Sequence, residues 1–179
     1  MRLSIRISIA LAALLVPLSL VAAGCGGDKP TDVEEGEGLE LGGLVYNVAI
    51  TRFLNPDNIE DKEYLVGQKP PPIGSDYLGV FLTIKNEDEE DLPSAHTYQI
   101  YDTTGRVFRP LESDSPFALD IGANVPVDEE LPLEDSTAAT GPTESAMLLY
   151  LIPEDAPDNR PLNMEIQSVL GDGTIKLDL

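Results

Sequence analysis

The sequence contains little of what catalytic, metal-binding and nucleic-acid-binding proteins rely on. It has one cysteine, one histidine, no tryptophan, and 11 lysines and arginines against 32 acidic residues. A single cysteine excludes an intramolecular disulfide and a cysteine-based zinc cluster. The formal net charge of −21 argues against nucleic-acid binding and against electrostatic adhesion to anionic lipid, because both need lysine and arginine. The 42% share of hydrophobic residues is still enough for a packed core, so wholesale disorder is not expected.

Residues 1–24 have the order of a secretory signal peptide. Arg2 and Arg6 precede an uncharged, mostly apolar run over residues 7–20, and small residues follow this run. The run is short for a bilayer span, which needs about 20 residues. We therefore expect cleavage after residue 24, with an uncleaved membrane anchor as the alternative.

The sequence Val21-Ala22-Ala23-Gly24-Cys25 resembles the lipobox of bacterial lipoproteins, and the only cysteine of the chain stands at the required place. This resemblance implies lipidation of Cys25, with diacylglycerol on the thiol and an acyl chain such as palmitate on the new amino group. Two acyl chains anchor a protein stably. The expected location is the extracytoplasmic face of the cell membrane. Ala22 departs from the usual leucine and leaves a secreted product, cut by ordinary signal peptidase, as the alternative.

The remainder of the chain divides into a tether and one domain. Residues 26–38 consist of glycine, acidic residues, lysine, threonine and proline with one valine, a composition that cannot bury apolar surface. We expect the lipidated cysteine and a flexible acidic tether over residues 25–43 and a folded domain over residues 44–179.

Apolar patterns of short period predict that this domain is built from β-strands. The expected strands are residues 44–53, 77–86, 97–102, 107–108, 146–152, 163–170 and 174–179. In the first of them Tyr46, Val48 and Ile50 share one face, and the continuously apolar run 146–152 is typical of a central strand. Fifteen prolines and 15 glycines interrupt the chain too often for long helices. The pattern predicts an antiparallel immunoglobulin-like β-sandwich, with a small β-barrel as the alternative.

The order of these segments resembles a bacterial family of extracytoplasmic immunoglobulin-like domains of unknown function, related in fold to mycobacterial secreted immunogenic proteins. The resemblance spans about residues 44–170, and its matching residues are Lys85, Asn86, Asp102, Gly105, Phe108, Pro110, Pro153 and Glu154. Residues 141–144 (Gly-Pro-Thr-Glu) depart from the Pro-Gly step that often precedes the closing strand of the family. The resemblance implies a sandwich fold and carries over no catalytic residue.

Candidate catalytic groups are few. His96 has no histidine or cysteine partner for a metal, and no Gly-x-Ser-x-Gly elbow is present to supply a nucleophile, so a surface position is expected. Carboxylate pairs arise by chance among 32 acidic residues, and no tryptophan is available to stack a sugar. We expect no enzymatic activity, no catalytic residue and no cofactor.

Runs of acidic residues in the expected loops are candidate binding sites for Ca²⁺. Oxygen ligands on loops at the end of a sandwich suit Ca²⁺, which makes Glu87, Asp88, Glu90 and Asp91 candidate ligands. Adjacent acidic side chains point in different directions, however, so a solvated turn is the simpler interpretation.

Two further features are candidates for contact with a partner. The segment Lys69-Pro70-Pro71-Pro72 predicts polyproline II, and tyrosines are favoured at interfaces. The tyrosines are Tyr46, Tyr64, Tyr77, Tyr98, Tyr101 and Tyr150. The function predicted is a non-enzymatic, lipid-anchored module that binds an envelope protein or a small ligand, with no nucleic acid. The alternatives are a calcium-stabilised structural or adhesive domain and a hydrolase with His96 in a deep pocket.

Overall fold

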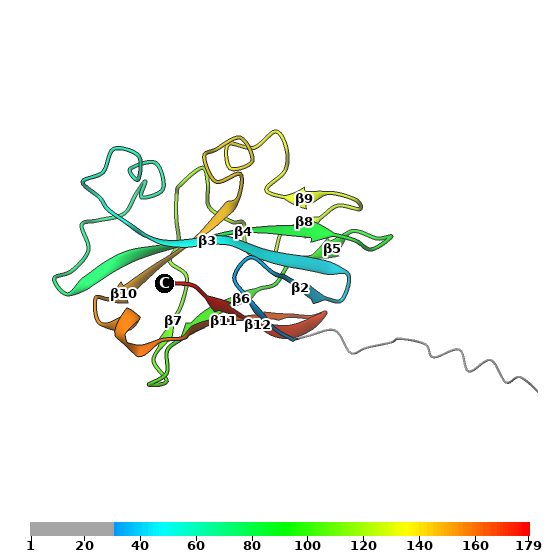
Figure 1. Cartoon of the computed structure of the whole chain (residues 1–179). Coiled ribbons are helices and arrows are strands. Elements are labelled where there is room, and N and C mark those ends of the chain that lie inside the picture. Colours follow the sequence, from blue (N-terminus) through cyan, green and yellow to red (C-terminus); the bar gives the residue numbers. More distant parts are fainter. Residues whose placement is uncertain (1–30) are drawn as a thin grey trace, which may run out of the picture.

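The computed structural model describes residues 31–179, which form two β-sheets packed face to face (Figure 1). The expected signal peptide and the expected lipidation site, Cys25, lie outside this range. The strands are β1 (Asp32–Glu34), β2 (Gly38–Leu41), β3 (Leu44–Leu54), β4 (Ser75–Asn86), β5 (Leu92–Pro93), β6 (Thr97–Tyr101), β7 (Val107–Phe108), β8 (Asn124–Val125), β9 (Glu130–Leu131), β10 (Ala146–Pro153), β11 (Leu162–Ser168) and β12 (Gly171–Leu177). The single helix within the described range is the short 3₁₀-helix η1 (Ala156–Asn159), and no helix in that range is long and apolar enough to cross a membrane.

The two sheets have the pairing expected of an antiparallel sandwich. One sheet has the order β10-β4-β3-β2, with β9 paired to the end of β4, and the other has the order β1-β12-β11-β6-β7. A two-stranded pair, β5-β8, lies beside them, and β1-β12 is the only parallel pair among the named strands. The all-β sandwich is therefore confirmed, and the small closed barrel is wrong.

The main core fills the space between the two sheets, and the alternation along β4 explains how it forms. Leu78, Val80, Leu82 and Ile84 all point inward and are fully buried, as the period of two predicts. The facing sheet contributes apolar residues from β6, β11 and β12 to the same cluster. These are Tyr98, Ile100, Leu162, Met164, Ile166, Ile175 and Leu177.

A β-bulge in β3 changes the alternation that the sequence predicted there. Tyr46 and Val48 point inward as expected, but the register shifts between Val48 and Ile50, and Ile50 is 40% exposed on the outer face. Thr51 takes the inward position opposite Val80 instead. The extra residue of a bulge moves every following side chain to the other face, which a regular period of two cannot anticipate.

A second hydrophobic cluster covers the outer face of the β10-β4-β3 sheet. It joins strand residues to residues of three loops, β3–β4, β7–β8 and β9–β10, and its members are Leu54, Tyr64, Leu65, Tyr77, Phe81, Phe117, Ala138, Met147 and Leu149. The Tyr64 ring lies 5.1 Å from Phe81 and 4.7 Å from Phe117 between centroids. The part of the sheet under this cluster is consequently buried on both faces, whereas Ile50 and Lys85 remain exposed on the outer face.

The strand β10 is an edge strand, which corrects the expectation of a central one. It pairs only with β4, but the loop after β7 runs along its other edge. The N–H of Met147 donates to the carbonyl of Phe117 (2.7 Å), and the N–H of Leu111 donates to the carbonyl of Leu149 (2.7 Å). The continuous apolar run reflects cover by this loop and by the second cluster rather than a central position.

The folded part begins earlier than the expected boundary at residue 44. Asp32–Glu34 pairs with β12 and Gly38–Leu41 pairs with β3, so most of the described part of the expected tether belongs to the sandwich. Val33, Leu39 and Leu41 supply the buried side chains of these strands. The strands expected at residues 163–170 and 174–179, with a hairpin turn at the intervening Gly171-Asp172-Gly173, form a hairpin, but its turn is at residues 169–170 and Gly171–Gly173 lie within β12.

Candidate functional site

The loop between β3 and β4, residues 55–74, is the longest connection between the named strands and lies at one end of the sandwich (Figure 1). We call it the β3–β4 loop. The chain enters the fold at the opposite end, where the N–H of Thr174 donates to the carbonyl of Thr31 (2.7 Å). Gly42 there lies against Leu170, so the β2–β3 and β11–β12 turns are neighbours. The eleven residues of β3 separate that end from the loop.

An arginine from the outer face of β3 holds the β3–β4 loop in place. Arg52 Nη1 lies 2.7 Å from Asp61 Oδ1, and the Asp61 side chain is only 4% exposed. The other oxygen of Asp61 accepts the N–H of Asn55 (2.9 Å). The guanidinium also lies over the rings of Tyr64 and Phe81, at 5.4 and 5.5 Å from their centroids. Such paired and stacked contacts order a loop that has no strand of its own.

Two open hollows lie against this loop. The larger, about 430 Å³, is called the Ile59 hollow, and it is lined by Arg52, Ile59, Glu60, Glu63, Tyr64 and Pro142. The smaller, about 170 Å³, is lined by residues that include Lys62, Lys69, Pro70 and Tyr77. Tyr77 donates its hydroxyl to the carbonyl of Lys69 (2.7 Å), which fastens the start of the proline-rich segment to the sheet.

Although the base of the β3–β4 loop is well anchored, its outer side exposes large apolar side chains. Ile59 is 80% exposed, Val66 is 43% exposed and Ile73 is fully exposed. These three side chains on one ordered loop leave apolar area that is available to a contacting molecule.

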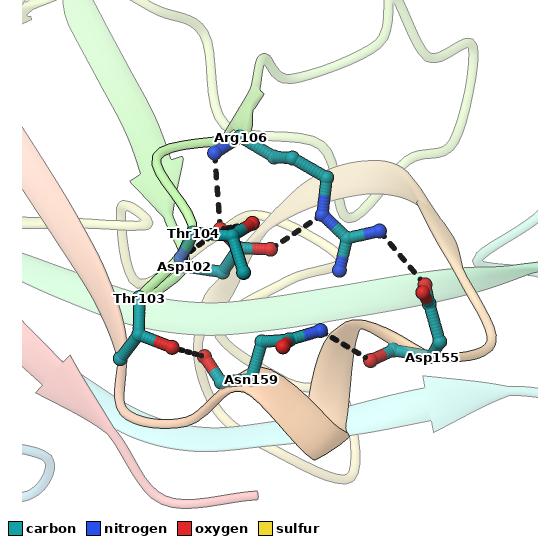
Figure 2. A network of polar contacts seen from close by, with 6 residues as sticks. All are labelled: Asp102, Thr103, Thr104, Arg106, Asp155 and Asn159. Carbon is teal, nitrogen blue, oxygen red and sulfur yellow. Dashed lines mark hydrogen bonds and ion pairs between the residues drawn. The ribbon is translucent and has the colours of Figure 1, made fainter.

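A polar network at the same end fixes the turn between β6 and β7 (Figure 2). Asp102 Oδ1 accepts the N–H groups of Thr104 (2.9 Å) and Arg106 (3.0 Å), while its Oδ2 accepts Arg106 Nε (2.5 Å). Arg106 Nη1 donates to Asp155 (2.8 Å), before η1, and Thr103 Oγ1 donates to the carbonyl of Asn159 (3.0 Å). The network joins the turn to the β10–β11 connection.

The charge state of Asp102 follows from these contacts. Burial alone would raise the pKa of its carboxyl, but the hydrogen bonds from Thr104 and Arg106 outweigh burial and lower the pKa to about 2. Arg106 already pairs with two carboxylates, so this network serves to stabilise the turn. Gly105, with φ +84°, supplies the left-handed position that the turn requires.

The remaining candidates from the sequence do not form a site within residues 31–179. His96 is exposed just before β6, and not inside the deep pocket that a hydrolase would need. Among the described residues, no three histidine, cysteine or acidic side chains converge as metal ligands. Of the calcium candidates, Glu87 pairs with Lys85 (2.8 Å) and Asp91 accepts the N–H of Val127 (3.0 Å). The side chain of Asp88 accepts the N–H of Glu89 (2.7 Å), and the carbonyl of Glu90 accepts Asn86 Nδ2 (2.8 Å).

The tyrosines proposed for a binding face are largely core residues. Tyr46, Tyr98 and Tyr150 are buried between the sheets, and Tyr64 and Tyr77 are buried in the second cluster. Burial raises the pKa of Tyr46 to about 12, although the hydrogen bond from the N–H of Ala95 opposes this, and burial raises the pKa of Tyr150 as well. Arg52 and Ile59 were not among the residues predicted from the sequence. The signal available was the length of the β3–β4 loop, which exceeds an ordinary hairpin connection.

Comparison with known proteins shows that this chain is similar to some of them in fold. No model of a protein family matches the chain, and no curated protein matches it. The yjhA protein from Bacillus subtilis superposes with a TM-score of 0.54 at 14% identity, over 81% of this chain and 99% of that chain. A Bacillus subtilis protein described as a "putative lipoprotein (ycdA)" superposes with a TM-score of 0.51 at 12% identity, over 80% of this chain and 38% of that chain. The secreted protein MPT63 from Mycobacterium tuberculosis superposes with a TM-score of 0.49 at 12% identity, over 86% of this chain and 100% of that chain. The first two likenesses show a shared β-sandwich fold.

Proposed function

We propose that this protein is a non-enzymatic, lipid-anchored binding module on the extracytoplasmic side of the membrane, and that the β3–β4 loop is its contact surface. The observation that carries the proposal is an ordered loop, clamped by Arg52 and Asp61, that nevertheless exposes Ile59 and Ile73. Exposing apolar side chains on a rigid support lowers the entropy cost of binding, because little has to be ordered when the partner arrives. We propose an envelope protein rather than a small ligand as the partner, because Ile59 and Ile73 are exposed on the surface of the loop and not inside an enclosed pocket.

The position of the loop fits an anchor at Cys25. Only residues 26–31 separate Cys25 from β1, so even a fully extended chain spans about 25 Å between Cys25 and Asp32. The strand β3 is about 35 Å long, so the β3–β4 loop lies about that distance from the end of the sandwich at which the chain enters the fold. An anchored domain of this shape presents the loop away from the lipid.

A photocrosslinking experiment in intact cells tests the proposal. A photoreactive residue is placed at Ile73, on the exposed side of the loop, and in a matched variant at Val169, which is 78% exposed at the opposite end. We expect one defined crosslinked protein with the first variant and none with the second. The Cys25→Ser form should lose the crosslink together with the membrane fraction. A crosslink of equal yield at both positions would contradict the loop as the contact surface.

A further inference from the structure

We propose that the Ile59 hollow receives a basic side chain, lysine or arginine, from a segment of the partner protein. This inference rests on the proposed function and names the chemistry of the partner at the β3–β4 loop.

The balance of charge in the hollow favours a cation. Its one positive group, Arg52, is already paired with Asp61 at 2.7 Å, so that ion pair carries no net charge. Glu60 and Glu63, both exposed, line the same hollow and leave it negative by two charges. An anionic ligand would have to displace Asp61 from Arg52 while approaching two carboxylates.

The apolar part of the lining fits the stem of such a side chain. Ile59 and Pro142 are both exposed and lie on the same hollow as the two glutamates. Lysine and arginine bury their methylene stems along apolar surface while the charged head stays hydrated, so a lining of this composition accepts both parts of one side chain. The combination distinguishes this hollow from the purely acidic turn at residues 87–91.

The aromatic rings below the hollow do not supply the binding site for the cation. Tyr64 and Phe81 are each within 5.5 Å of the Arg52 guanidinium, so the available cation–π contact is made within the protein. A bound cation is therefore held by Glu60 and Glu63. At longer range, the net charge of −21 attracts basic partners and raises their association rate.

A peptide titration tests the inference, using the full chain purified in a non-ionic detergent. The probe is a fluorescent peptide of alternating lysine and alanine, and its counterpart has glutamate in place of lysine. The test variant Glu60→Gln/Glu63→Gln removes two charges and keeps the shape of the hollow. The matched control Glu89→Gln/Glu90→Gln removes two charges from the acidic turn at the other end of the sandwich.

We expect the lysine peptide to bind the native protein and to bind the test variant about tenfold more weakly, with less than a twofold change for the control. A second variant, Ile59→Lys, places a cation at the mouth of the hollow on a side chain that is 80% exposed, and it should abolish binding without lowering the melting temperature. Equal weakening in test and control variants, no binding of the lysine peptide, or tighter binding of the glutamate peptide would overturn the inference. If the crosslink at Ile73 forms while the lysine peptide fails to bind, this inference fails and the proposed function stands.

Discussion

Asp102 shows how one carboxylate can fix a turn and make stability depend on pH. Its side chain is fully buried and accepts hydrogen bonds from two backbone N–H groups, the Thr104 hydroxyl and the Arg106 guanidinium. These donors stabilise the charged form of the carboxyl, which is why its pKa falls below the ordinary value of 3.8 despite burial. The folded state thus binds this proton more weakly than the unfolded state does.

The first prediction concerns this pH dependence and the variant Asp102→Asn. Because the folded pKa is about 2, the stability contributed by the carboxylate is complete above about pH 4 and is lost as the pH falls toward 2. Native protein should therefore take up as much as about one proton more than Asp102→Asn when it unfolds between pH 4 and 2. Urea unfolding at intervals across this range measures the difference. Parallel stability curves for the two proteins would show that the carboxylate makes no such contribution.

The second prediction uses two threonines in opposite situations. Thr51 is 5% exposed, and its hydroxyl has no hydrogen-bond partner in the part of the chain that the structure describes, whereas Thr103 Oγ1 donates to the carbonyl of Asn159. Thr51→Val should raise the free energy of unfolding by about 1 kcal/mol, because it removes an unpaired buried polar group. Thr103→Val should lower it by about 0.5 kcal/mol. Urea denaturation of both variants checks the signs, and the same sign for both would refute the argument.

At the scale of strands and loops, the sequence predicts elements whose pattern is regular and misses those that depend on distant contacts. The inward row Leu78, Val80, Leu82 and Ile84 follows from local alternation alone. The bulge in β3 and the pairing of Asp32–Glu34 with β12 depend on contacts with strands that are distant in the sequence, and neither leaves a periodic pattern in the sequence.

The architecture around the proposed contact surface was harder to predict for the same reason. Tyr64 and Phe117 are in loops with no period of two or 3.6, yet they complete a hydrophobic cluster over the outer face of the sheet. Arg52 appears in the sequence as one more polar residue of an alternating strand. Its role as a clamp is evident only when Asp61 folds back over it.

The third prediction concerns the order of the β3–β4 loop. Arg52→Ala should lower the free energy of unfolding by about 2 kcal/mol, because it leaves the nearly buried Asp61 without its partner and removes two cation–π contacts. Backbone amides of the loop, including that of Tyr64, should then exchange faster in hydrogen-exchange mass spectrometry. The control Lys62→Ala removes the same charge from an exposed position in the same loop and should leave exchange unchanged. Similar exchange in the two variants would mean that Arg52 does not hold the loop.

At the scale of the whole molecule, the two ends of the sandwich have different surroundings. The acidic turn at residues 87–91 lies at the end where the chain enters the fold, since the N–H of Glu87 donates to the carbonyl of Gly43 (2.9 Å) in the β2–β3 turn. A domain anchored through Cys25 brings this turn toward the bilayer, where anionic lipid repels it. In the proposed anchored form, the six residues between Cys25 and β1 limit the separation of the domain from the bilayer, and the repulsion opposes a closer approach of this turn. Together they favour an upright domain with the β3–β4 loop outermost.

The last prediction tests this orientation by labelling cysteines with a bulky maleimide polymer in membranes from producing cells. Ile73→Cys and Val169→Cys replace two side chains that are both well exposed, one at each end of the sandwich. In the anchored protein, labelling at position 169 should be several-fold slower than in the matched Cys25→Ser form, which is labelled in the soluble fraction of the same cells, because about 25 Å of chain between the lipid and the fold leaves little room for the polymer. Labelling at position 73 should be the same in both forms. If anchoring slows both positions equally, the domain lies along the membrane, and the β3–β4 loop is not the outermost surface.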